Sequence, residues 1–263
     1  MRKYLFIFKS EVMSNLQYVF NIITSFIGYF LILFVLLNLW KYMYSDPSQV
    51  INGYTMNQMV WYVVVTEILW GSLGGRSLSK KICSDVRSGN IAYNMNKPYS
   101  YIGYCLSSHL GSLAIRFILY TVLGMLVGFM FLGSFPTLNI LSVLCILITG
   151  ILATIISTLL ITSIGLLSFF IEDAHPFYWL YSKVILVLGT IFPIEYFPKV
   201  IQPILNYSPV YVVSYGPAKL FVDFNYNSFI SIILAQIIYI FIAYTICNFM
   251  YKKGVKNLNV NGG

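Results

Sequence analysis

A long stretch without a charged side chain, from Phe117 to Ile171, limits what this chain can fold into more than any other feature. A helix needs about 20 apolar residues to cross the hydrocarbon core of a membrane, so this stretch is about twice as long as one crossing. It must therefore fold back on itself. Residues 133–137, which include Gly133 and Pro136, supply the turn residues for doing so. The stretch predicts two membrane helices joined by a tight turn.

The composition is typical of a membrane protein. Hydrophobic residues make up 59% of the 263 residues and charged residues only 9%, whereas soluble domains carry roughly 25% charged residues. A chain of this length has room for about six helical crossings with short loops. The net charge of +8 does not indicate nucleic-acid binding, because the basic residues stand beside the ends of apolar segments, as in membrane proteins.

We predict an all-α membrane protein with a single domain over residues 1–263 and six transmembrane helices. Leu5, Phe8, Val12 and Leu16 recur at helical spacing, which predicts a helix in the cytoplasmic interface before the first crossing. The alternative is that these residues simply begin that crossing. Prolines break up the segment before the sixth crossing, and short helices at the outer interface are expected there. The predicted crossings are residues 18–40, 56–74, 101–132, 140–170, 178–194 and 229–251.

The positions of lysine and arginine predict that both termini face the cytoplasm. Short cytoplasmic loops of membrane proteins are enriched in these two residues. With the N-terminus inside, the outer loops hold only Lys41, Lys199 and Lys219. The inner segments hold Arg2, Lys3, Lys9, Arg76, Lys80, Lys81, Arg87, Lys97, Lys252, Lys253 and Lys256.

The loop between the second and third predicted crossings is the most polar part of the chain. Within it, Leu78, Ile82 and Val86 recur every four residues and form one narrow apolar stripe on a short helix. Gly89 follows where the end of a helix favours a residue that tolerates positive φ. A stripe flanked by charge suits docking into a groove on a partner protein. The alternative is that the helix lies on the lipid surface, where its basic residues hold it.

The chain resembles the permeases of ABC-2-type exporters, in the branch often found as two different permeases with one ATPase. The resemblance rests on the N-terminal helix, on Gly53-Tyr54 before the second crossing, on the run from Ile82 to Tyr93, on Lys97-Pro98, and on the proline-rich outer segment. It covers most of the chain, and its one compact motif is residues 88–98. Asn94-Met95-Asn96 departs from that motif, in which leucine is commoner.

The resemblance implies a bacterial inner-membrane protein whose short cytoplasmic helix sits in a separate ABC ATPase. ATP and magnesium would bind to that ATPase, and this chain would bind no cofactor. The sequence contains no Gly-x-x-x-x-Gly-Lys-[Ser/Thr] phosphate loop, in agreement with this division. The other expected partners are membrane lipid and a second permease subunit, identical or homologous. The residues assigned to ATPase coupling are Leu78, Lys81, Ile82, Asp85, Val86, Arg87 and Gly89.

Two ionisable residues inside predicted crossings are functional candidates, because a charge at mid-membrane costs at least a few kcal/mol. Glu67 and Arg116 lie at comparable depths on the second and third crossings. An ion pair joining the two helices is the favoured interpretation, with substrate contact, gating or a proton relay as alternatives. His109 and His175 lack metal-ligand spacing, and no catalytic motif is present, so we predict neither a metal site nor an enzyme.

The resemblance places the first, second and fifth crossings along the substrate pathway. Their aromatic and aliphatic faces favour export of a hydrophobic or amphipathic substrate, such as a drug, a peptide or a lipid-like molecule. A secondary transporter or channel independent of ATP is the competing function, although its membrane core ought to contain more polar groups. The candidate pathway residues, which alternatively pack in the core or face lipid, are Phe20, Phe26, Tyr29, Trp61, Tyr62, Tyr178 and Tyr181.

Overall fold

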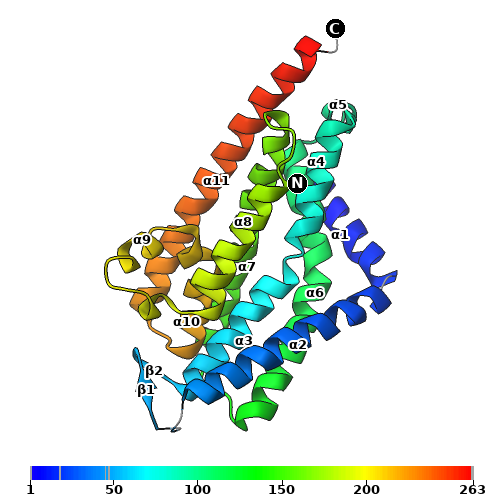
Figure 1. Ribbon diagram of the computed structural model, residues 1–263. Helices are drawn as coiled ribbons and strands as arrows, with labels where there is room; N and C mark the ends of the chain where they lie inside the picture. The colour runs from blue at the N-terminus through cyan, green and yellow to red at the C-terminus, as the bar shows by residue number, and fades with distance from the viewer. Residues whose placement is uncertain (1, 18, 45, 47, 262–263) are drawn as a thin grey trace.

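The computed structural model describes residues 2–17, 19–44, 46 and 48–261, which form a bundle of long helices with short helices packed between them (Figure 1). One antiparallel hairpin pairs β1 (Val50–Ile51) with β2 (Tyr54–Thr55). The helices are α1 (Arg2–Gln17), α2 (Val19–Met43), α3 (Met56–Ser72), α4 (Gly75–Arg87), α5 (Asn90–Met95), α6 (Tyr101–Leu132), α7 (Ile140–Leu166), η1 (Leu167–Phe169), α8 (His175–Ile185), η2 (Leu186–Ile191), η3 (Ile194–Tyr196), α9 (Gln202–Asn206), η4 (Tyr211–Tyr215), α10 (Gly216–Val222) and α11 (Tyr226–Asn261).

Four of the described helices are long and apolar enough to cross a membrane. They overlap the residues predicted as the first, third, fourth and sixth crossings, and residue 18, where the first was expected to begin, lies outside the described residues. The limits of α6 coincide with residues 101–132 of the third predicted segment. The Ser100 side chain caps the start of this helix, and Gly133, with a φ of 73°, ends it. The segments that qualify are Phe26–Met43, Tyr101–Leu132, Ile140–Phe169 and Tyr226–Lys256.

Helices also occupy the second and fifth predicted crossings, but they differ from the other four. Helix α3 has 17 residues and is surrounded by α2, α6 and α10, so most of its side chains are buried. Thr55 and Gln58 form a reciprocal capping box at its start. Helix α8 has 11 residues and continues into the π-helix η2. Whether α3 and α8–η2 cross the membrane stays a prediction.

The π-helix η2 is held by hydroxyl groups of neighbouring helices. A π-turn departs from the regular hydrogen-bond ladder, and carbonyls that it leaves free need other donors away from water. The Gly189 carbonyl accepts hydrogen bonds from the hydroxyls of Tyr62, at 2.6 Å, and Ser214, at 2.8 Å. The Thr190 carbonyl accepts one from Thr66 at 3.0 Å. These bonds fix η2 between α3 and η4.

Short helices fill the segment before α11, as expected from its prolines, but two of them are not at the surface. The π-helix η4 and the following α10 pack against α3 and α7, and Val212, Val213 and Ala218 are buried. Gln236 of α11 donates hydrogen bonds to the carbonyls of Val212 and Thr149, both at 2.9 Å. The apolar side chains of η4 and α10 therefore complete the core of the bundle.

The two ends of the bundle differ in character. Helices α4 and α5 and the end of α11 lie at one end, which we call the α4 end, and the β1–β2 hairpin lies at the other, the hairpin end (Figure 1). Helix α1 begins at the α4 end, where the Lys3 ammonium bonds the Pro98 carbonyl and the Tyr4 hydroxyl accepts from the Ser100 backbone N–H. Both ends of the described chain are therefore at the α4 end.

Helix α1 packs along α6 through a very close contact at Gly111. A Cβ added there would lie 2.5 Å from the Phe8 carbonyl oxygen and 2.9 Å from the Glu11 Cβ. The Glu11 carboxylate also accepts a hydrogen bond from Ser108 at 2.7 Å. Leu5 and Leu16 of α1 stay exposed.

We expect Gly111→Ala to lower the free energy of unfolding by about 1 to 2 kcal/mol, because the obstructing atom belongs to the backbone and cannot move aside as a side chain would. The measurement is the midpoint of thermal unfolding in detergent. Gly28→Ala is the matched control, since nothing lies within 4 Å of a Cβ added at Gly28. Equal midpoints for the two variants would contradict the contact between α1 and α6.

Candidate functional site

The apolar stripe of α4 lies inside the protein's own core. Leu78 and Val86 are 5% and 6% exposed and Ile82 is fully buried, among side chains of α6, α7 and α11. Ile82 packs so closely on Gly165 of α7 that a Cβ added to this glycine would lie 2.8 Å from its own Cβ. This corrects the expectation that the stripe is presented to a partner, because the ends of the neighbouring long helices already cover it.

Polar side chains of α4 form hydrogen bonds with side chains of α6. The Lys81 ammonium donates a hydrogen bond to the Tyr104 hydroxyl at 3.1 Å and lies 4.9 Å from the centre of that ring. The Asp85 carboxylate accepts a hydrogen bond from the Tyr101 hydroxyl at 2.8 Å. Gly89, just after α4, has a φ of 76°, which confirms the conformation predicted for it.

Arg87 joins α4 to the loop between η1 and α8. Its guanidinium lies 3.6 Å from the Asp173 carboxylate and bonds the Glu172 carbonyl oxygen. Both charged side chains are more than half exposed, so the pair itself contributes at most about 1 kcal/mol to stability. The contact holds the last turn of α4 next to the loop that leads into α8.

The side of α4 that remains free is polar and basic. It borders an open groove of about 720 Å³ between α4 and the loop before α8. Arg76, Lys80 and Arg87 line this groove together with Asp173 and His175. The exposed Ser84 lies among them, one helical turn after Lys80. A partner protein at this end of the bundle would meet hydroxyl groups and positive charge.

Glu67 and Arg116 are not joined by an ion pair. Glu67 is 2% exposed, and its Oε1 has no hydrogen-bond partner. The Arg116 side chain extends toward Gly74 at the end of α3, where a Cβ added to the glycine would lie 2.5 Å from its Nη1. Gly74 is seven residues after Glu67, about 10 Å along a helix. Arg116 therefore belongs to the α4 end, and the favoured interpretation of the two residues as a pair is corrected.

The candidate pathway residues of the first predicted crossing lie in different surroundings. Phe20 is 77% exposed. Tyr29 is buried and stacks on Tyr120 with 4.5 Å between the ring centres, and Phe26 packs beside both rings. Tyr29 and Phe26 thus join α2 to α6.

The other four aromatic candidates come from α3 and α8. Tyr62 is buried and donates a hydrogen bond to η2, and Tyr181 packs in the cluster that covers the α4 stripe. Trp61 stacks on Phe135 at 5.3 Å and lines a cavity of about 330 Å³ at the hairpin end. Tyr178 lines a cavity of about 680 Å³ at the α4 end. Trp61 and Tyr178 are therefore the two of these four that we place beside open space.

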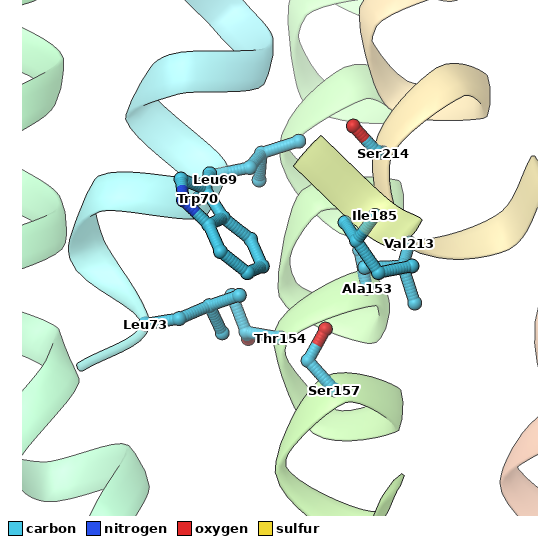
Figure 2. Close-up of a pocket in the computed structure, with 9 residues that line it drawn as sticks. All are labelled: Leu69, Trp70, Leu73, Ala153, Thr154, Ser157, Ile185, Val213 and Ser214. Atoms are coloured by element: carbon cyan, nitrogen blue, oxygen red, sulfur yellow. The ribbon is translucent and has the colours of Figure 1, made fainter. Parts of the chain in front are cut away.

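Part of the region between these two cavities is tightly packed. Trp70 and Leu69 of α3 face Ile185 and Val213 across a gap of only about 10 Å³ (Figure 2), which has room for a single water molecule. A larger apolar cavity of about 170 Å³ lies between α3, α6, α7 and α10, and Phe117 is among its lining residues. At this gap α3 therefore packs tightly against α7, α8 and η4.

A polar network at the hairpin end was not predicted from the sequence. The Glu195 carboxylate accepts hydrogen bonds from the hydroxyls of Tyr54, at 3.1 Å, and Tyr215, at 2.6 Å, and lies 3.9 Å from the Lys219 ammonium. Burial raises the pKa of the Tyr54 phenol, and Tyr215 and Glu195 raise it further, so Tyr54 stays a donor. The only signal in the sequence is a single acid among the prolines and tyrosines of residues 193–217.

Comparison with known proteins agrees with this architecture. The family described as "ABC-2 family transporter protein" matches residues 13–262. A search of curated proteins finds no significant match. Within the described residues, no group of histidine, cysteine, aspartate and glutamate side chains could hold a metal ion. The match spans nearly the whole chain, including the long apolar helices and α4, and so the protein belongs to the ABC-2 family of transporter membrane components.

Proposed function

We propose that this chain is the permease subunit of an ATP-driven exporter, with α4 as the helix through which a separate ABC ATPase acts. The ATPase would bind ATP and magnesium and would dock at the α4 end on the groove around Arg76, Lys80, Ser84 and Arg87. The α4 end would face the cytoplasm of a bacterial cell, with all six predicted crossings in the inner membrane and α1 at the interface.

The observation that carries this proposal is the way in which α4 is attached. Its stripe is buried against α6, α7 and α11, and Arg87 links it to the loop before α8. A force applied to its free basic face would therefore reach several long helices at once. Packed helices respond to such a force by rigid-body shifts, because their interfaces do not deform continuously.

Two further observations support the remaining parts of the proposal. The gap between α3 and the facing residues of α7, α8 and η4 has room for only one water, which favours a substrate path between two permease subunits. The second subunit would be a copy of this chain or a homologue of it. The apolar cavity of about 170 Å³ favours a hydrophobic or amphipathic substrate.

Isolation of the tagged full chain from its own cells in mild detergent tests the ATPase contact. We expect an ATPase chain to co-purify, and we expect Ser84→Trp to reduce the amount recovered by about tenfold or more, because an indole in the groove prevents close docking. Ser84 is exposed, so the variant should elute from size exclusion as the natural protein does.

Lys199→Trp, at an exposed position of the hairpin end, is the matched control and should recover the ATPase in full. Undiminished recovery with Ser84→Trp would place the ATPase contact elsewhere. Transport by the purified chain in liposomes without an ATPase would contradict the proposal altogether and favour a secondary transporter or channel.

A further inference from the structure

The cavity of about 680 Å³ at the α4 end has an unusual charge distribution. It lies where α3 ends and α4 begins, between α6, α7 and α8. Arg76, Lys80 and Arg116 all line it, and none of its described lining residues is acidic. The salt bridges found among the described residues involve none of these three. Asp173 lines the neighbouring groove, which shares Arg76 and Lys80 with the cavity, but it does not line the cavity itself. Three cations that share one cavity repel one another and favour an anion in the space between them.

The position of Arg116 strengthens the preference of this cavity for an anion. Its Nε is buried without a hydrogen-bond partner, and its Nη1 lies beside Gly74, the residue that directly precedes α4. The N-terminus of a helix carries a partial positive charge, so a guanidinium beside it is unfavourable by itself. No side chain caps this helix start. An anion in the cavity would be attracted by the guanidinium and the helix end together.

The remaining walls of the cavity are apolar or aromatic. Trp70 comes from α3, Leu73 directly follows that helix and Ile161 comes from α7. The Tyr178 hydroxyl lies 3.2 Å from the position of a Cβ added to Gly75. Arg76 and Lys80 are exposed, whereas Arg116 is partly buried deeper in the cavity. The site thus offers positive charge at two depths beside apolar surface, which is the pattern that an anionic amphipathic molecule requires.

We propose that this cavity binds the anionic head of an amphipathic molecule, a phosphate or a carboxylate, between Arg116 at its inner part and Arg76 and Lys80 at its mouth. The proposal rests on the proposed function in one respect, since it assigns the class of substrate that enters the transport pathway. Tyr178 and the apolar wall would hold the part of the tail next to the head.

Binding to the purified full chain in a neutral detergent tests this inference without any ATPase. Fluorescently labelled phosphatidylglycerol and phosphatidylcholine serve as probes, and the dissociation constants are measured by microscale thermophoresis. We expect phosphatidylglycerol to bind about tenfold more tightly than phosphatidylcholine, and Arg116→Gln and Lys80→Gln each to weaken its binding by about tenfold, as loss of one charge-assisted hydrogen bond would.

Two further variants make the result specific. Arg116→Lys keeps the charge and should retain most of the affinity for phosphatidylglycerol. Lys252→Gln removes an exposed cation at the same end of the bundle but outside the cavity, and should leave the affinity unchanged. Because Lys80 is exposed, its variant keeps the inference testable even if Arg116→Gln does not fold.

Inorganic phosphate at millimolar concentration distinguishes the two sources of the anion. Displacement of phosphatidylglycerol by phosphate would assign the site to a free anion, and failure to displace it would assign the site to the head of a lipid-like molecule. Equal affinity for the two lipids, or full affinity in both glutamine variants, would overturn the inference. The ATPase test with Ser84→Trp is independent of this one, so either proposal can fail without the other.

Discussion

Replacing Ile82 by aspartate should prevent the protein from folding, and not simply uncouple it from a partner. The Ile82 side chain is fully buried against Gly165 and the cluster formed by α6, α7 and α11. An aspartate there would lose the apolar contacts and place a carboxylate where no cation lies within the packed stripe. We expect a loss of at least about 4 kcal/mol in the free energy of unfolding, a large part of the 5 to 15 kcal/mol typical of a domain.

The measurements are the yield of monodisperse protein on size exclusion and the midpoint of thermal unfolding. Ser84→Asp introduces the same carboxylate on the exposed side of the same helix, and should change stability by no more than about 0.5 kcal/mol. Ile82→Leu keeps the volume and should cost under about 1.5 kcal/mol. An Ile82→Asp protein as stable as the natural one would show that α4 does not pack as described.

The sequence predicted the long helices well because their limits depend on local chemistry. Helix α6 covers residues 101–132 as expected, since the Ser100 side chain caps its start and Gly133 supplies the left-handed residue that ends it. Helices α7 and η1 end at residue 169, next to the predicted limit at residue 170. An uncharged apolar run and its turn residues are enough to locate such helices.

What the sequence could not provide is the identity of the neighbour on each face. The spacing of Leu78, Ile82 and Val86 shows that α4 has an apolar face. The same spacing is expected whether that face packs in a groove on a partner or against the protein's own helices. The depths of Glu67 and Arg116 follow from counting residues, whereas the direction in which each side chain extends does not. Both corrections come from packing between helices that are distant in the sequence.

The network around Glu195 was missed for a related reason. Tyr54 is 141 residues away from Glu195 along the chain, and no periodic pattern connects them. The network joins four separate segments at the hairpin end, because the Tyr44 hydroxyl also donates to the Tyr54 carbonyl at 2.9 Å and lies 2.9 Å from the Tyr196 hydroxyl. Only the fold brings these residues to one place.

Removing the Glu195 carboxylate should therefore loosen the hairpin end. In Glu195→Ala the hydroxyls of Tyr54 and Tyr215 lose their acceptor, and Lys219 loses one of its two acidic partners and keeps Asp223, 3.0 Å away. Because the Glu195 side chain is 33% exposed, water replaces part of what is lost, and we expect a decrease of about 2 to 3 kcal/mol in the free energy of unfolding. Hydrogen exchange should quicken at β2, η3 and η4, with little change at α4.

Four further variants test the role of the Glu195 carboxylate. Glu195→Gln retains an acceptor oxygen and should cost about 1 kcal/mol, as should Tyr215→Phe, which removes one hydrogen bond. The double variant Glu195→Ala/Tyr215→Phe should cost less than the sum of its two parts, because the tyrosine hydroxyl has already lost its partner. Glu172→Ala removes an exposed acid at the opposite end of the bundle and should be nearly neutral. If Glu195→Ala proved no more destabilising than Glu172→Ala, the carboxylate would not be the group that holds the hairpin, η3 and η4 together.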